Sequence, residues 1–302
     1  MSKQLKADLS LLAVTLVWGS SFVLTKNALD HLSTFNFLAI RFILAALISG
    51  IIFYKNIIQA DKNTIKYGIL IGAILFTGYA LQTTGLNYTS ASKSGFITGF
   101  SVVIVPILSA YLLKIKPPKS AVIGVVFAII GLGFLTLDSS LSLNIGDLYT
   151  LISSLMFALH IITVGKYTAE VDSIVMAIVQ IGVVGILSLF FSFATEKPII
   201  PTGTEIWLPL FILAILCTSG AFIVQNVMQK FTTPTHTALI YSGEPVFSAI
   251  FAYFVAGELL TSKAIWGCGL ILAGMVISEL DWKIVFSKKV TDSTPNEKEA
   301  SE

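Results

Sequence analysis

The chain has 302 residues, of which 55% are hydrophobic and only 12% are charged. A water-soluble protein of this length needs more polar surface, so the composition excludes a soluble globular protein and indicates an integral membrane protein. The net charge of +2 is too small to suggest a nucleic-acid partner. Cys217 and Cys268 lie in apolar runs without a ligand partner nearby, so we expect neither a disulfide framework nor a metal site.

Ten apolar stretches each have about 20 residues, the length that a helix needs to cross the hydrocarbon core of a membrane. They lie near residues 8–29, 34–54, 66–86, 92–113, 119–137, 147–166, 173–194, 206–229, 235–255 and 262–280. Because the intervening segments are short, consecutive helices must lie close together and no loop has room for a separate soluble domain. The sequence therefore predicts an all-α integral membrane protein with ten transmembrane helices embedded in a lipid bilayer.

The lysines are distributed unequally between the two membrane faces. With ten spans both chain ends lie on one face, which collects fourteen lysines, whereas the opposite face has four. Because cytoplasmic loops carry an excess of Lys and Arg, this bias predicts a multi-pass protein of the cell membrane with both termini in the cytoplasm. The polar segment 287–302 follows the last span and is predicted to be a disordered cytoplasmic tail.

The chain has the pattern of two related halves. The segment ADLSLLAVTLVWG (7–19) resembles GDLYTLISSLMFA (146–158) at an offset of 139 residues. Further along, similar residues recur at an offset of 143, and the pairs are Gln82 with Gln225, Gly95 with Ala238, Gly99 with Ser242, Gly124 with Gly267, and Gly131 with Gly274. We expect one five-helix repeat in residues 1–138 and a second in residues 139–286.

Five spans per repeat is an odd number, so the second repeat must enter the membrane from the opposite face. The halves are then inverted repeats related by a pseudo-two-fold axis in the membrane plane, a transporter architecture with the substrate site near the midplane. The glycine-rich segments 124–133 in span 5 and 267–274 in span 10 allow close helix packing. They indicate packing within the chain or, alternatively, a homodimer interface through spans 5 and 10.

A family resemblance rests on several motifs together. The segments LVWGSSFVLTK (16–26), NFLAIRF (36–42) and SGEPVFSAIFAYFVAGELLT (242–261), with the duplicated five-helix unit, resemble the EamA family of the drug/metabolite transporter superfamily. The resemblance covers residues 8–280 and implies a ten-helix secondary carrier for small metabolites, amino acids among them, and often an exporter. His160 departs from the family pattern, in which its position is often aromatic or small.

Glu244 and Pro245 lie within the apolar span 9, close to the membrane midplane. An unpaired carboxylate in lipid is costly, so Glu244 is expected to face a cavity, to pair or to be protonated. Pro245 removes a backbone hydrogen bond and weakens the helix, which suits a hinge. Pro106 in span 4 is a possible matching hinge, although the two prolines do not align at the offset of 143. The alternative is a structural carboxylate that accepts hydrogen bonds from a neighbouring helix.

Two other side chains with polar chemistry lie inside spans. Arg41 in span 2 could hold a substrate carboxylate through two hydrogen bonds. Alternatively, it reaches toward the membrane surface or forms a structural ion pair. His160 in span 6 can donate and accept hydrogen bonds and could carry a proton during transport. Its alternative role is that of a hydrogen-bonded packing residue.

Further candidates would complete a substrate site. Trp18 is too deep for an interfacial aromatic belt, and Tyr241 lies one turn before Glu244. An aromatic-lined cavity would suit an apolar or aromatic ligand, although such residues also fill bundle cores. The other predicted substrate-binding residues are Ser21, Gln82, Thr98 and Gln225. Weaker candidates are Phe22, Phe96, Phe100, Ser101 and Gln180.

The motifs favour a carrier for a small-molecule substrate. No Walker A loop, zinc-ligand cluster or nucleophile elbow occurs, so we expect no ATP-driven pump, no catalytic residues, no metal and no cofactor. The alternatives are a polytopic membrane enzyme and a non-transporting receptor or scaffold. An enzyme usually gathers His, Asp and Glu at one membrane face, and a receptor usually carries a signalling domain. Glu258, at the end of span 9, is expected to be a solvated helix end.

Overall fold

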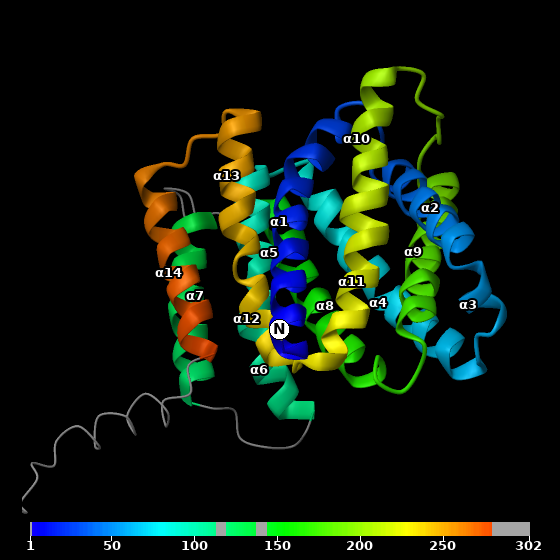
Figure 1. Cartoon of the computed structure of the whole chain (residues 1–302). Helices are drawn as coiled ribbons and strands as arrows, with labels where there is room; N and C mark the ends of the chain where they lie inside the picture. Colours follow the sequence, from blue (N-terminus) through cyan, green and yellow to red (C-terminus); the bar gives the residue numbers. More distant parts are fainter. Residues whose placement is uncertain (1, 113–118, 137–143, 280–302) are drawn as a thin grey trace, which may run out of the picture.

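The computed structural model describes residues 2–112, 119–136 and 144–279, and it contains helices and no strand within these ranges (Figure 1). The predicted tail 287–302 lies outside the described residues. In chain order the elements are α1 (Lys3–Leu29), α2 (Thr34–Ile52), α3 (Tyr54–Ile58), α4 (Lys62–Leu86), α5 (Ala91–Gly99), α6 (Ser101–Leu112), α7 (Lys119–Thr136), α8 (Ile145–Tyr167), α9 (Ser173–Thr195), α10 (Thr204–Ala214), the π-helix η1 (Ile215–Gly220), α11 (Ala221–Met228), the 3-10 helix η2 (Gln229–Phe231), α12 (Pro234–Tyr241), α13 (Glu244–Ala256) and α14 (Ser262–Glu279).

The predicted class, an all-α integral membrane protein, is confirmed. Within the described residues, 8 helices are long and apolar enough to cross a membrane. Three of them are composites, in which α5 continues into α6, α10 into η2 and α12 into α13. The shorter apolar helices Val122–Leu135 and Ser262–Ile277 occupy the places expected for spans 5 and 10. The total of ten spans therefore stays a prediction, as do the division into two repeats and their inversion.

Capping side chains set where many of these helices begin. An oxygen of a Ser, Thr, Asp or Asn side chain accepts a hydrogen bond from a backbone N–H of the first turn, which otherwise has no partner. The capping residues are Ser2 for α1, Asp61 for α4, Ser90 for α5, Asn144 for α8, Asp172 for α9 and Thr233 for α12. The helices α1 and α4 begin at one face of the bundle, and α8 ends there. We call it the lysine-rich face, because Lys3, Lys62 and Lys166 lie at these helix ends. The other face is called the opposite face.

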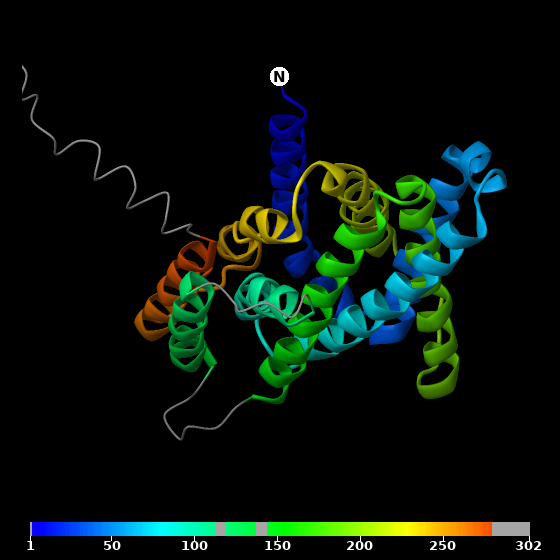
Figure 2. The same ribbon diagram turned by 90° about the horizontal axis from the view of Figure 1, so that it is seen from below.

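The helices α7 and α14 form a pair at one end of the molecule, whereas α2, α3 and α9 lie at the other end (Figure 2). Glycines allow the backbones of the pair to touch. A Cβ atom added to Gly131 would lie 2.6 Å from the carbonyl oxygen of Gly267, and one added to Gly274 would lie 2.6 Å from that of Gly124. The glycines of spans 5 and 10 thus pack against each other within one chain. A homodimer through these spans would have to use their other faces, and it stays a prediction.

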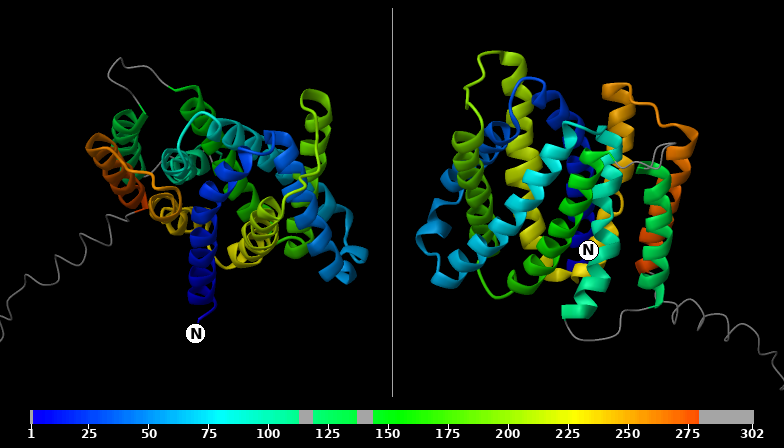
Figure 3. Two further views of the ribbon diagram at one scale, coloured as in Figure 1. Left: turned by 90° about the horizontal axis from the view of Figure 1, so that it is seen from above. Right: turned by 180° about the vertical axis from the view of Figure 1, so that it is seen from behind.

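Between the two ends, α4 and α8 run side by side with a slant (Figure 3). Their closest approach is again at glycines, because a Cβ atom added to Gly146 would lie 2.6 Å from the carbonyl oxygen of Gly85. The helix α1 crosses the centre of the molecule and packs on α13, where Gly19 lies against Phe247. The centre of the bundle is therefore enclosed by helices that come from both halves of the chain.

Two spans are broken near their middle. Span 9 is interrupted at Ser242 and Gly243, between α12 and α13, and Pro245 is the second residue of α13. Its ring lacks an N–H and conflicts with the carbonyl four residues earlier, which explains the end of α12. Span 4 is interrupted at Phe100, between α5 and α6, whereas Pro106 lies inside α6. Pro106 therefore does not coincide with the break at Phe100, and its predicted role as the matching weak point stays a prediction.

The positions of the two breaks correspond in the repeat. At the offset of 143, Phe100 matches Gly243, so both spans are interrupted at equivalent residues although their prolines do not align. The breaks thus occur at corresponding positions, although Pro245 lies close to one of them and no proline lies as close to the other. Pro245 then reinforces one of the two breaks. The role of Pro106 and Pro245 as hinges stays a prediction.

Candidate functional site

A cavity lies in the centre of the bundle. About 500 Å³ of space not filled by protein atoms lies in this region, including open solvent. The cavity is lined by Trp18, Ser21, Phe22, Tyr79, Gln82, Thr98, Ser101, Phe157, His160, Ile161, Phe222, Gln225, Tyr241 and Glu244. The lining combines six aromatic rings with a small number of polar groups, which is typical of a site for a small molecule.

The lining residues form pairs at the repeat offsets. The pairs are Trp18 with Phe157, Ser21 with His160 and Phe22 with Ile161 at an offset of 139, and Tyr79 with Phe222, Gln82 with Gln225, Thr98 with Tyr241 and Ser101 with Glu244 at an offset of 143. These seven pairs include every lining residue. Such a pattern is expected where equivalent surfaces of two related halves meet around a pseudo-two-fold axis.

Each wall of the cavity is built from two residues three positions apart. Residues with this spacing share a face of a helix, so both side chains can point to one space. The walls are Trp18 with Ser21, Tyr79 with Gln82, Thr98 with Ser101, Phe157 with His160, Phe222 with Gln225, and Tyr241 with Glu244. In five of the six walls an aromatic residue precedes a polar residue. The two remaining lining residues, Phe22 and Ile161, follow Ser21 and His160 directly.

The two helix breaks lie in the cavity wall. Thr98 and Ser101 flank the break at Phe100, and Tyr241 and Glu244 flank the break at residues 242–243. At the breaks the backbone makes hydrogen bonds that span three residues, from the N–H of Phe100 to the carbonyl oxygen of Ile97 and from the N–H of Gly243 to that of Ile240. Interrupted helices are a feature of transporter binding sites. The cavity thus coincides with the part of spans 4 and 9 where the helical hydrogen-bonding pattern changes.

The aromatic rings pack on one another around Trp18. Its ring centroid lies 5.2 Å from that of Tyr241 and 5.3 Å from that of Phe222. The indole Nε1 donates a hydrogen bond to the carbonyl oxygen of Cys217 at 3.0 Å. Across the cavity, Tyr79 meets Phe157 edge to face at 5.4 Å. These contacts hold the rings in defined orientations toward the cavity.

The acceptor for Trp18 lies in the π-helix η1, which the sequence did not indicate. A π-turn changes the backbone hydrogen-bonding pattern and often occurs at functional sites. Here η1 is attached to α2 as well as to α1, because Ser219 and Ser49 share a hydrogen bond of 2.7 Å between their hydroxyl groups. The π-helix therefore connects spans 1, 2 and 8 directly behind the cavity wall.

Arg41 does not line the cavity, contrary to its predicted place. Its guanidinium is buried, and Nε donates a hydrogen bond to Oγ1 of Thr218 in η1 at 2.8 Å. The guanidinium carbon lies 5.3 Å from the ring centroids of both Phe42 and Tyr79. Tyr79 faces the cavity, so Arg41 is one layer behind the wall. Helical rise predicted its depth in the membrane but not the neighbouring helices that enclose it.

Several polar lining groups use their hydrogen bonds within the protein. Gln82 donates from Nε2 to Oγ1 of Thr98 at 2.9 Å, and Ser21 donates to the carbonyl oxygen of Trp18 at 2.8 Å. His160 shares a hydrogen bond of 2.7 Å between its Nε2 and Oε1 of the buried Gln180. Gln180 lies at the position equivalent to Arg41, at an offset of 139, and it also supports the wall from behind.

Three polar lining groups lack such partners. Within the described part of the chain, the hydroxyl of Tyr241 and the side-chain oxygen of Gln225 are buried without a hydrogen-bond partner. Neither ion pair found among the described residues includes Glu244, and no described group donates a hydrogen bond to its carboxylate. Buried polar groups are normally satisfied, so these three are available to a ligand.

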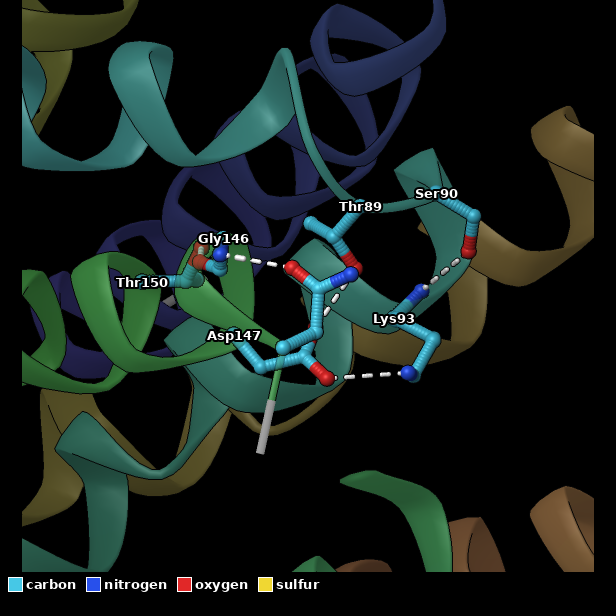
Figure 4. Close-up of polar contacts among 7 residues, drawn as sticks. Thr89, Ser90, Lys93, Gly146, Asp147 and Thr150 are labelled. Atoms are coloured by element: carbon cyan, nitrogen blue, oxygen red, sulfur yellow. Dashed lines mark hydrogen bonds and ion pairs between the residues drawn. The ribbon is translucent and has the colours of Figure 1, made fainter. Parts of the chain in front are cut away.

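Polar contacts hold the helices together at the opposite face. The buried carboxylate of Asp147 forms an ion pair with Nζ of Lys93 at 2.9 Å and accepts a hydrogen bond from Thr89 at 2.6 Å (Figure 4). Nζ of Lys26 donates to the carbonyl oxygens of Leu86 and Thr89 at 2.9 and 2.6 Å. These contacts connect α1, α5 and α8 with the turn between α4 and α5.

The sequence analysis expected Glu258 to be a solvated helix end, and this expectation is wrong. Its carboxylate accepts hydrogen bonds from the backbone N–H groups of Ala91 and Ser92 at 2.9 and 3.0 Å, so it caps α5 from another span. Gly257, with a φ of 64°, ends α13 in the left-handed conformation that lets the chain turn toward α5. At the same face, Glu196 caps the start of α2 in this way.

The structure brings together most of the predicted site residues. Eight of the nine predicted substrate-binding residues line the cavity, and Arg41 does not. The sequence analysis missed Tyr79, Phe157, Ile161 and Phe222. The three aromatic residues each precede a predicted polar residue by three positions, and this recurring spacing could have identified them. Their role in binding a substrate stays a prediction. Within the described residues, no three His, Cys, Asp or Glu side chains gather as metal ligands.

Comparisons with known proteins agree with this architecture. The sequence profile of the EamA-like transporter family matches residues 5–137 and again residues 144–280. A protein of Archaeoglobus fulgidus named an uncharacterized transporter is 37% identical over 279 residues, which cover 92% of this chain and 87% of that protein. A protein of Rickettsia bellii named an S-adenosylmethionine uptake transporter is 25% identical over 80% of this chain and 84% of its own length.

A known crystal structure shares the fold. It superposes with a TM-score of 0.69 over 94% of this chain and 98% of its own, at 16% identity. At this identity the likeness concerns the fold alone. The two profile matches together span most of the sequence, and the relative from Archaeoglobus fulgidus is similar over nearly its whole length. The resemblance seen in the sequence is thereby confirmed, and the chain belongs to the EamA-like transporter family.

Proposed function

We propose that this membrane transporter is a secondary carrier that moves a small organic metabolite through the central cavity by alternating access. The observation that carries the proposal is the position of the two helix breaks. Both lie in the cavity wall, between Thr98 and Ser101 and between Tyr241 and Glu244. A span that is interrupted at the site can bend there, so one half can move while the other keeps its contacts.

The contacts at the opposite face favour a cavity that is closed toward that face in this conformation. The ion pair of Lys93 with Asp147 and the capping of α5 by Glu258 join different spans at that face. In this mechanism, opening toward the opposite face requires that such contacts separate. The relatives are named transporters, which favours transport over the enzyme and receptor alternatives.

For the orientation, we place the lysine-rich face in the cytoplasm of a cell-membrane protein, because the excess of lysine lies there. For the direction, we propose export, which the resemblance to the family favours. The relative from Rickettsia bellii is named an uptake transporter, so the names of the relatives do not favour export. Direction therefore needs its own measurement.

Metabolite profiling tests the proposal. Cells that express the wild-type chain, the Glu244→Gln variant or neither are compared for metabolites inside the cells and in the medium. We expect one class of small metabolite to accumulate in the medium only with the wild-type chain. Accumulation inside the cells would reverse the direction but keep the carrier. Identical profiles from all three strains, with equal amounts of protein in the membrane, would contradict the carrier.

A further inference from the structure

The cavity contains one carboxyl group and no basic partner for it. Glu244 is the one acidic residue among the lining residues, and the lining contains no lysine or arginine. Glu244 is partly buried near the middle of span 9, where a carboxylate without a partner is costly. The remaining lining side chain that could carry a positive charge is that of His160, and its Nε2 already shares a hydrogen bond with Gln180. The wall therefore presents a carboxyl group that has no built-in positive partner and that a bound cation would stabilise in its ionised form.

The nearest candidates for a countercharge are engaged elsewhere. Lys93 pairs with Asp147, and Lys26 donates to two backbone carbonyls at the opposite face. Arg41 lies behind Tyr79, hydrogen-bonded to Thr218 and packed against aromatic rings. No described group thus neutralises Glu244, and a bound ligand is the available source of positive charge.

The hydrogen-bonding groups of the wall that have no partner also favour a ligand with N–H donors. Glu244 and the side-chain oxygen of Gln225 are acceptors without donors, and the hydroxyl of Tyr241 can donate or accept. Two acceptors of this kind suit a ligand with N–H groups. Among the other polar lining side chains, Gln82 and Ser21 already donate hydrogen bonds within the wall, whereas the hydroxyls of Thr98 and Ser101 can still donate or accept.

The aromatic lining completes the argument. The ring centroid of Trp18 lies 5.2 Å from that of Tyr241 and 5.3 Å from that of Phe222. All three rings line the same cavity as Glu244. Aromatic faces attract cations, and they also stack on flat apolar groups. A carboxylate next to such rings binds a positive group better than a neutral or negative one, because both the charge and the ring quadrupoles are favourable.

We infer that the cavity selects an organic cation, a small compound with a protonated amine next to a flat apolar group. This inference rests on the proposed carrier function and specifies its substrate class. The positive group lies against Glu244 and Gln225, and the flat group lies among the aromatic rings. A zwitterionic amino acid fits less well, because Arg41, the residue expected to hold a substrate carboxylate, is outside the lining.

Three probes with the same phenylethyl skeleton test the inference. They are 2-phenylethylammonium as a cation, L-phenylalanine as a zwitterion and 3-phenylpropionate as an anion. Binding is measured by calorimetry on the purified full-length protein in lipid nanodiscs. We expect the cation to bind at least about tenfold more tightly than either other probe, which is about 1.4 kcal/mol. Equal or tighter binding of the zwitterion or the anion would overturn the inference, and so would no binding of the cation at millimolar concentration.

Matched variants locate the effect. Glu244→Gln keeps the shape of the side chain and removes its charge, and it should reduce cation affinity by about tenfold while leaving the other two probes within about threefold. Glu205→Gln removes an exposed carboxylate from the first turn of α10 and should change nothing. Unchanged cation binding in Glu244→Gln would contradict the assigned role of Glu244.

The result also separates the substrate class from the carrier function. If the cation binds selectively but the metabolite profiles do not differ between strains, the site stands and the carrier fails. If the profiles reveal a transported metabolite that is neutral or anionic, the carrier stands and the cation site fails. We expect the metabolite found by profiling to carry a positive charge at neutral pH.

Discussion

Ser101 and Glu244 line the same cavity from two different broken spans, at positions separated by the repeat offset of 143. Each residue follows its helix break, Ser101 after Phe100 and Glu244 after Gly243. The two positions thus correspond in sequence offset and in their place after a break, but one carries a small hydroxyl and the other a carboxylate. The same asymmetry holds for Ser21 and His160, so the carboxyl group and the imidazole of the lining both belong to the second half of the chain.

Moving the carboxylate to the equivalent position tests this symmetry. Glu244→Ser should lose most of the selectivity for 2-phenylethylammonium, because the single negative group is absent. The double variant Ser101→Glu with Glu244→Ser should regain part of it, since the charge again faces the same space. Binding to nanodisc-embedded protein is the measurement, and thermal unfolding checks that both variants fold. A folded double variant that binds no better than Glu244→Ser would contradict equivalent positions around one cavity.

The contact between α7 and α14 predicts a stability change. In Gly131→Ala, the new methyl group would lie 2.6 Å from the carbonyl oxygen of Gly267, a backbone atom that cannot move without separating the helices. We expect a loss of about 1–3 kcal/mol, the usual cost of overpacking, seen as a lower melting temperature in detergent. Gly269→Ala is the control, because a Cβ atom there meets nothing within 4 Å. Equal melting temperatures for the two variants would argue against the close helix pair.

Thiol labelling tests the orientation of the chain. Thr202→Cys, in the exposed segment between α9 and α10, should react with an impermeant thiol reagent on intact cells. Gln59→Cys, exposed at the lysine-rich face, should react only after permeabilisation. The native Cys217 and Cys268 are buried and should remain silent. The reverse labelling pattern would place the termini outside the cytoplasm.

The cap that Glu258 provides for α5 predicts a local effect. In Glu258→Ala, the N–H groups of Ala91 and Ser92 lose their acceptor, which should lower the free energy of opening at the start of α5 by about 1 kcal/mol. Hydrogen exchange followed by mass spectrometry should then be faster in the peptide that includes these amides. Glu205→Ala, an exposed position on α10, serves as the control. Unchanged exchange at α5 would mean that the carboxylate contributes nothing to this helix end.

Much of the site could be predicted because two properties follow from the order of residues alone. They are the depth of a residue in its membrane span and the internal repetition of the sequence. Helical rise puts Glu244 and Trp18 near the middle of their spans, and the offset of 143 links Gln82 to Gln225. All four line the cavity. The missed aromatic residues lie one turn from predicted polar ones, as Tyr79 does from Gln82, so they were within reach of the same reasoning.

By itself, the sequence determined the membrane class and located the long apolar helices, because hydropathy depends on neighbouring residues along the chain, and its motifs pointed to the family. Only the tertiary structure decided what each side chain contacts. It placed Arg41 behind Tyr79, directed Glu258 to the start of α5, and paired Gly131 with Gly267. The physical reason is that rise along a helix gives depth in the membrane, whereas the partner of each face depends on how separate helices pack.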